Sequence, residues 1–253
     1  MKNFVKELLL FLSLICIVAT IGCEPDPSPI DPIFNDTVLA DTVPTDTIFN
    51  DTVPNDPIPF GWVDLGLPSG LLWGYCNVGA SSPEQYGDYF AWGETQPKVY
   101  YDWIGYKYCV GGDHELTKYC SLPSYGYNGF VDTLTVLQSE DDAATVNLGN
   151  GARMPTYEDW LELIHCTTCH YAVFNGVEGN RFVGPNGSWI FLPSAGYCVG
   201  GDTVNAGNGG FYWAASIWLD IPYCAWNCAS NLSELFGNYR CNGMPVRAVR
   251  SMY

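Results

Sequence analysis

One helical pattern stands out in the chain. Trp160, Leu163 and Ile164 recur at the three- and four-residue spacing that places side chains on one face of a helix. Thr156 lies just before this pattern, and Asp159 follows Thr156 by three positions, which is the spacing of a capping box. The pattern therefore predicts a capped amphipathic helix that begins at Thr156.

A second helix is predicted to begin shortly before Ala143. Ser139 and Asp142 are both residues that cap helix N-termini. Glu140, Asp141 and Asp142 form an acidic run that could bind calcium. At the start of a helix, however, carboxylates more often serve the cap and the helix dipole, and we favour that interpretation.

Strand patterns are short. Residues 181–183 and 189–192 are candidate strands joined by the turn dipeptide Asn186-Gly187, and residues 245–249 form another candidate strand. Glycine and proline are scattered between these segments, which indicates short elements and long loops. The sequence therefore predicts a mixed α+β fold, compact and irregular, with short strands and about two short helices.

The N-terminus has the anatomy of an export signal. Lys2 and Lys6 precede an apolar run, Leu8 to Ile21, that ends before Gly22 and Cys23. A helix of that length reaches roughly 21 Å, short of the roughly 30 Å hydrocarbon core of a bilayer. The segment Thr20 to Cys23 resembles a bacterial lipobox, so we expect residues 1–22 to be removed and Cys23 to carry a lipid. The alternative is an ordinary secretory signal with an incidental cysteine.

Residues 23–59 differ in composition from the rest of the chain. After Cys23 they contain no Lys, Arg or Gly, and Asp recurs at every fifth position from Asp26 to Asp56. A period of five fits neither a helix nor a strand, and repeated like charges with proline favour a solvated, extended chain. We expect a disordered stalk that holds the following domain away from the membrane.

Four Asp-Thr-aliphatic triplets lie inside this stalk. They resemble the acceptor sequence of the general O-glycosylation systems of some Gram-negative gut bacteria. The resemblance makes four threonines candidate O-glycosylation sites: Thr37, Thr42, Thr47 and Thr52. Duplication of a disordered repeat without modification is the equally weighted alternative.

Residues 60–253 form one domain of ordinary size. It contains all nine Trp and all seventeen Tyr, and its eight basic and eighteen acidic residues give a formal charge of −10. That charge disfavours nucleic acid and anionic membrane surfaces as partners. Only three histidines are present, and no nucleophile-elbow, phosphate-loop or zinc-hydrolase motif occurs, so we expect no enzyme activity.

Several segments of this domain resemble the Fibrobacter major paralogous domain family. The similar segments cover most of residues 61–250 and include 63–73, 77–80, 86–94, 141–144, 153–156, 191–196, 212–216 and 245–247. The resemblance implies an exported lipoprotein of a gut anaerobe with a fold related to the C-type-lectin and formylglycine-generating-enzyme superfold. It implies no specific activity, because that superfold hosts binders and enzymes alike.

Nine cysteines fall in the domain, and an odd number cannot all pair. Cys166, Cys169 and His170 form a Cys-x-x-Cys-His motif, which is the spacing for covalent haem attachment, and His165 could complete a zinc site instead. Short motifs of this kind often match by chance. We favour a structural or disulfide-forming pair here and expect no cofactor.

Aromatic residues are dense between positions 86 and 127. Exposed Tyr and Trp rings stack on sugar faces and carry a polar handle, which suits glycan or protein recognition. The candidate ligand-binding residues are Trp92, Tyr100, Tyr101, Trp103, Tyr106 and Tyr108. The alternative for each ring is a place in the core.

Together these features predict a stalked lipoprotein of the cell envelope, lipid-anchored at the outer membrane and exposed at the surface. Its domain is expected to bind an extracellular glycan or protein without catalysis. A structural envelope or adhesive-fibre component is the first alternative, and a haem or metal protein is the second. An open patch of Trp and Tyr would favour a glycan site, whereas a free strand edge would favour assembly.

Overall fold

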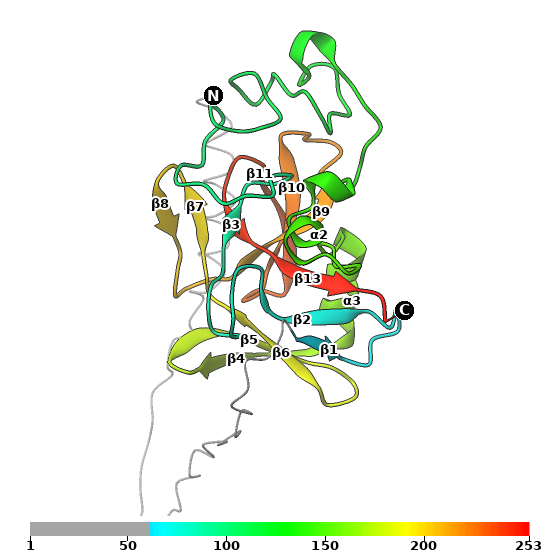
Figure 1. The fold of residues 1–253 in the computed structure, drawn as a ribbon, viewed down its shortest axis with the longest axis vertical. Helices are drawn as coiled ribbons and strands as arrows, with labels where there is room; N and C mark the ends of the chain where they lie inside the picture. Colours follow the sequence, from blue (N-terminus) through cyan, green and yellow to red (C-terminus); the bar gives the residue numbers. More distant parts are fainter. Residues whose placement is uncertain (1–60, 253) are drawn as a thin grey trace, which may run out of the picture. The chain divides into compact units, whose positions relative to one another are not determined.

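The computed structural model describes residues 61–252, and short antiparallel strands dominate this part of the chain (Figure 1). The mixed class predicted from the sequence is confirmed: short strands and long loops accompany two α-helices, one of which is short. Some predictions lie outside the described residues: the signal peptide 1–22, the lipidation site Cys23, the stalk 23–59, and the candidate glycosylation sites Thr37, Thr42, Thr47 and Thr52.

Within residues 61–252 the strands form three three-stranded sheets and two strand pairs, all antiparallel. The first sheet, in spatial order, contains β1 (Trp62–Asp64), β2 (Leu72–Asn77) and β13 (Arg247–Arg250). The second contains β11 (Glu234–Tyr239), β10 (Cys224–Ala229) and β9 (Phe211–Ile217). The third contains β4 (Thr168–Phe174), β5 (Val177–Val183) and β6 (Trp189–Pro193). The pairs are β3 (Tyr89–Phe90) with β12 (Met244–Pro245), and β7 (Tyr197–Val199) with β8 (Asp202–Val204).

The last strand, β13, pairs with β2, and a buried arginine on β13 strengthens this pairing. Arg247 is fully buried, and its guanidinium donates to the carbonyls of Gly74, Tyr75 and Phe191 at 2.8 Å and to the Asn77 side chain at 2.9 Å. These acceptors lie on β2 and β6. One side chain from β13 thus ties two sheets together, and each of its three guanidinium nitrogens has a hydrogen-bond partner.

Both predicted helices are present. Helix α3 (Tyr157–Cys166) has the predicted capping box, in which the Thr156 hydroxyl accepts from the Asp159 amide and the Asp159 carboxylate accepts from the Thr156 amide. Helix α2 (Ala143–Leu148) is capped by Asp142, which accepts from the Thr145 amide at 2.9 Å. Within residues 61–252, no helix has the length and apolar content needed to span a membrane.

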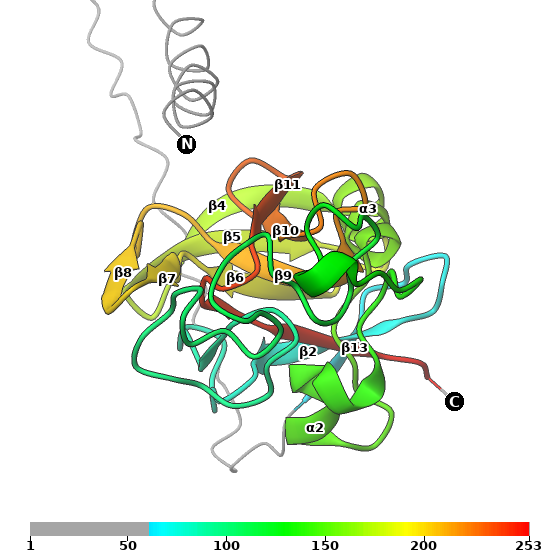
Figure 2. The ribbon, with the colours of Figure 1, turned by 90° about the horizontal axis from the view of Figure 1, so that it is seen from above.

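Helix α3 packs on the sheet formed by β9, β10 and β11 (Figure 2). The buried face of α3 carries Trp160, whose ring centroid lies 4.9 Å from that of Trp73. The Trp160 indole nitrogen donates to the Trp213 carbonyl. Trp160 and Leu163 are fully buried, as the helical pattern predicts. Trp73 and Trp160 belong to one of the two large core clusters, and Trp213 belongs to the other.

The predicted hairpin at residues 181–192 is confirmed. Strands β5 and β6 are joined across Asn186 and Gly187, and Gly187 has a φ of 85°, which glycine tolerates at no steric cost. The candidate strand at 245–249 is confirmed in part. Val246 interrupts it, because its carbonyl accepts from the Val78 amide while β12 and β13 pair with different strands.

Candidate functional site

The structure places four of the six predicted ligand-binding rings in the core. Trp92, Tyr101, Tyr106 and Tyr108 are 0–7% exposed. The Trp92 indole donates to the Ala214 carbonyl at 2.8 Å, and the Tyr106 hydroxyl donates to the Trp92 carbonyl at 2.7 Å. A ring covered on both faces has no surface left for a sugar, so the predicted exposed cluster does not form.

The remaining two candidates are more open. Trp103 is half-buried and contacts Tyr106 edge-on, with ring centroids 5.5 Å apart. Tyr100 is 60% exposed and lies over Gly200 and Gly201. Of the predicted rings, Tyr100 is therefore the one that presents a free face.

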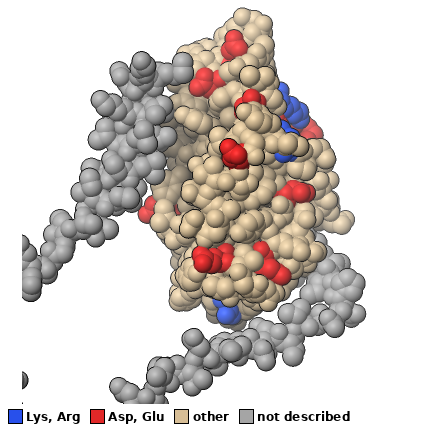
Figure 3. All heavy atoms as spheres, turned by 90° about the vertical axis from the view of Figure 1, so that its left-hand side faces the viewer, with Lys and Arg blue, Asp and Glu red and all other residues tan. Residues whose placement is uncertain are grey.

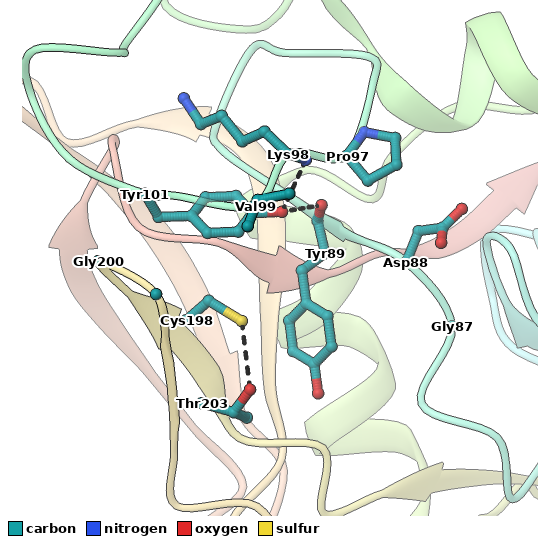
Figure 4. Close-up of a pocket in the computed structure, with 11 residues that line it drawn as sticks. Gly87, Asp88, Tyr89, Pro97, Lys98, Val99, Tyr101, Cys198, Gly200 and Thr203 are labelled. Atoms are coloured by element: carbon teal, nitrogen blue, oxygen red, sulfur yellow. Dashed lines mark hydrogen bonds between the residues drawn. The ribbon is translucent and has the colours of Figure 1, made fainter.

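A hollow of about 270 Å³ lies between the 97–101 loop and the β7–β8 hairpin (Figure 4). Tyr100 does not line it but lies over two of its lining residues, Gly200 and Gly201. Most of the polar side chains of this hollow are already hydrogen-bonded, although Asp88 also lines it. The Tyr101 hydroxyl donates to the Tyr89 carbonyl at 2.6 Å, and burial raises the pKa of Tyr101 to about 12. The Lys98 ammonium bonds to Glu94 and the Gly105 carbonyl, each at 3.0 Å. Cys198 contacts Thr203 at 3.6 Å. This hollow therefore offers few free groups to a polar ligand.

A second hollow, of about 360 Å³, contains aromatic rings that the sequence analysis did not select. The Trp218 and Trp226 rings are stacked with centroids 4.6 Å apart and planes 10° apart. Tyr157, the first residue of α3, lies 4.8 Å from the Trp226 ring. All three are half-buried, so each has an exposed part. We call Trp218, Trp226 and Tyr157 the aromatic platform.

The backbone holds the platform in place from two sides. Trp226 lies on β10 directly opposite Gly237 on β11, and the Trp218 ring occupies the space where a side chain at Gly237 would stand. On the other side, the Tyr157 amide donates to the Ser216 hydroxyl at 3.0 Å, which ties the start of α3 to the end of β9. Two of the three rings therefore stand on regular elements, Trp226 on β10 and Tyr157 on α3. Trp218 directly follows β9, and its amide donates to the Cys224 carbonyl at 3.2 Å.

Polar side chains surround the platform. Glu158 and Asp220 line the same hollow and are exposed, and Thr135 and Ser216 add hydroxyl groups. Carboxylates accept hydrogen bonds, and hydroxyls both donate and accept. An apolar stacking surface flanked by such groups can bind a ligand that has one apolar face and a rim of hydroxyls.

The electrostatics of the domain agree with a neutral or cationic ligand. The domain carries a formal charge of −10, and one face shows many Asp and Glu side chains and few Lys or Arg (Figure 3). Glu158 and Asp220 add two negative groups at the hollow itself. An anionic ligand would meet like charges there, which opposes binding.

Cys166, Cys169 and His170 do not converge on one point. Cys166 is the last residue of α3, whereas Cys169 and His170 are neighbours on β4. Neighbouring residues of a strand point to opposite faces. Cys169 packs against the core and its thiol contacts the Ser230 carbonyl at 3.7 Å, while His170 is exposed. No group of three or more metal-binding side chains occurs within residues 61–252.

The nine described cysteines are all free thiols, and five of them are buried. Burial raises the pKa of Cys224 and of Cys241 to about 12 and raises that of Cys228 as well. Because the thiolate is the nucleophile and the metal ligand, these residues are held in an unreactive form. They pack as small apolar side chains.

Comparison of the chain with family models, with curated proteins and with solved structures finds no match. The resemblance to the Fibrobacter major paralogous domain family, and the lectin-like identity it implies, therefore stay proposals.

Proposed function

We propose that this chain is a stalked lipoprotein of the cell envelope whose domain binds a glycan without catalysis. The stacked Trp218 and Trp226 rings carry the proposal. They present half-exposed indole surface in a hollow, beside carboxylates and hydroxyls. This combination matches the two sides of a sugar ring, which has a face of C–H groups and an edge of hydroxyls.

The size of the hollow supports a small glycan unit. Its volume of about 360 Å³ lies within the roughly 300–1,000 Å³ range of small-ligand sites. A sugar ring is not aromatic and contacts the platform through C–H groups, whose burial contributes about 25 cal/mol per Å² of apolar area. Two or three sugar contacts on the platform would therefore give weak binding to one unit, which repeated units on a polymer would strengthen through multivalency.

The site also restricts the class of glycan. Glu158 and Asp220 accept hydrogen bonds from hydroxyl or ammonium groups, and they repel sulfate and carboxylate substituents. We therefore expect neutral sugars or amino sugars to bind, and sialylated or sulfated glycans to be excluded.

A glycan array with the purified full chain tests the proposal. Trp226→Ala removes the central ring of the platform and should abolish binding to neutral glycans, while Tyr100→Ala removes an exposed ring beside the other hollow and should leave binding intact. If Tyr100→Ala abolishes binding and Trp226→Ala does not, the site is wrong. If the wild-type chain binds no glycan, or releases reducing ends from a bound one, the proposed function is wrong.

The envelope location rests on the N-terminal residues. We propose that Cys23 carries the lipid, so Cys23→Ser should abolish fatty-acid labelling and release the protein from membranes. Cys16→Ser, within the signal segment, is the matched control and should leave labelling unchanged. Labelling that persists in Cys23→Ser would refute the lipid anchor.

The stalk threonines have a separate test. If Thr37, Thr42, Thr47 and Thr52 carry glycans, replacing all four by Ala should lower and sharpen the apparent mass on a gel. An unchanged band from the native host would show that the stalk is unmodified.

A further inference from the structure

Strand β4 forms one edge of the sheet β4-β5-β6. Its pairing with β5 is regular over all seven residues, with no bulge. Among residues 61–252, no backbone hydrogen bond joins its other side to a third strand. Unpaired backbone groups along a strand edge are a template for pairing with another chain.

The hairpin turn determines which residues carry the unpaired groups. Asn175 and Gly176 form a two-residue loop with φ values of 49° and 83°, as a type I′ turn requires. The flanking pair Phe174 and Val177 is therefore hydrogen-bonded, and bonding to β5 alternates along β4 from there. Cys169, Tyr171 and Val173 consequently direct their amide and carbonyl groups away from β5, toward the free edge.

Common protections of a free edge are missing from β4. Its sequence, TCHYAVF, contains no Lys, no Pro and no acidic residue. Tyr171 is 65% exposed and Val173 is 57% exposed. The nearest charged residues in the sheet, Glu178 and Arg181, lie on β5, one strand away from the edge, and the Glu178 carboxylate accepts a hydrogen bond from the Tyr171 hydroxyl.

We propose that β4 pairs antiparallel with β4 of a second copy of this chain, about a two-fold axis at Tyr171. In this register Tyr171 faces Tyr171 of the second copy, and Cys169 faces Val173 in both directions. These are the three positions whose backbone groups point outward, so each pair can exchange both of its N–H···O bonds. The result is one continuous sheet across the dimer.

The charge distribution limits where a second copy can pair with this one. Two domains of formal charge −10 repel each other over most of their surfaces. Because β4 contains no Asp, Glu, Lys or Arg, two domains can pair along this strand without placing like charges from the two β4 strands next to each other. The facing Tyr171 rings would add an aromatic cross-strand pair, which stabilises antiparallel pairing.

Sedimentation analysis of the full chain carrying Cys23→Ser, which removes the proposed lipid anchor, tests the dimer. We expect a concentration-dependent dimer that Tyr171→Lys converts to a monomer, because two lysines would then face each other across the axis. Val146→Lys adds the same charge at an exposed position on α2 and should leave the dimer intact. Thermal melting of each variant shows that the fold is retained. A monomeric parent chain, or a Tyr171→Lys variant that still dimerises, overturns the proposal.

A second variant tests the register. Hydrogen-bonded partners in an antiparallel pair have Cα atoms about 5.5 Å apart, which a disulfide can bridge. Under mild oxidation Tyr171→Cys should give a covalent dimer on a non-reducing gel, above the level formed by the parent chain. Val146→Cys should not. Equal cross-linking of both variants would refute the two-fold pairing at Tyr171. Glycan binding need not change in either variant, so this outcome is independent of the proposed function.

Discussion

The Trp218 ring lies on the backbone of Gly237, in the space that any larger residue would fill with its side chain. Gly237 is on β11 and faces Trp226 across the sheet. The missing side chain therefore leaves room for Trp218 to stack on Trp226. A single glycine thus determines whether the aromatic platform can form.

Gly237→Ala should displace the Trp218 ring, because the new Cβ would overlap the indole. Loss of the stacked pair should cost about 1 kcal/mol in stability and should weaken glycan binding severalfold. Gly112→Ala is the control, since a Cβ there meets no neighbouring atom. Calorimetry and the glycan array measure the two effects. Unchanged binding by Gly237→Ala would show that Trp218 does not contact the ligand.

The parts of the fold that were predictable are those with local causes. The capping box at Thr156 and Asp159 involves residues three positions apart, and the Asn186-Gly187 turn joins adjacent strands. Sequence patterns report such short-range relationships directly. Strand β4 was missed because its residues were considered for their chemistry as a Cys-x-x-Cys-His motif and not for their place beside β5.

The candidate site was not predictable in the same way. Trp218 and Trp226 are separated by a turn, and they stack because of the β9–β10 pairing and the absence of a side chain at Gly237. The density of rings between residues 86 and 127 signalled aromatic content but not exposure. Arg240 instead gathers several of those rings in the core, with its guanidinium 4.8 Å from the Trp92 ring centre and 5.3 Å from that of Tyr106.

Arg240→Lys should destabilise the domain by about 3 kcal/mol, because one ammonium cannot replace a planar fork of donors. The buried guanidinium donates to the carbonyls of Lys118, Tyr119 and Pro222 and to the Tyr106 hydroxyl. Arg181→Lys, at a half-buried position over Trp189, should cost about 1 kcal/mol or less. Urea unfolding compares the two variants. Similar losses in both would contradict a central role for Arg240.

Asp141 should make the domain sensitive to acid. Burial opposes its ionisation, but hydrogen bonds from Lys118, Tyr108, Tyr119 and Lys107 outweigh that effect and lower the pKa of Asp141 from 3.8 to about 2. A carboxyl group whose pKa is lower in the folded state than in the unfolded chain stabilises the fold at pH values above its unfolded-state pKa. This contribution, about 2 kcal/mol, should be lost as the pH falls from about 4 to about 2.

Asp141→Asn should remove this part of the acid dependence and lower stability at neutral pH. Asp202→Asn, at an exposed position on β8, is the matched control and should follow the parent curve. Thermal melting as a function of pH measures both. If Asp141→Asn loses stability with acid as steeply as the parent, the carboxylate is not the group that titrates.

The last prediction is that the Cys-x-x-Cys-His motif binds no covalent haem. Haem attachment requires both thiols and the histidine to face one flat ring in an apolar pocket. Here Cys169 packs inward against the core, and the adjacent His170 lies exposed on the same strand, so their side chains point to opposite faces. Cys166 lies at the end of α3, where it packs against the same core cluster as Cys169.

Expression in a host with cytochrome maturation should therefore yield protein without a Soret band that survives denaturation. Cys169→Ala tests whether this cysteine serves the packing of the core and not the attachment of haem. It should lower the melting temperature, because it removes a thiol that packs against the core. His170→Ala changes an exposed side chain and should leave the melting temperature nearly unchanged. A stoichiometric covalent chromophore that both substitutions abolish would contradict this arrangement and would place the protein in electron transfer.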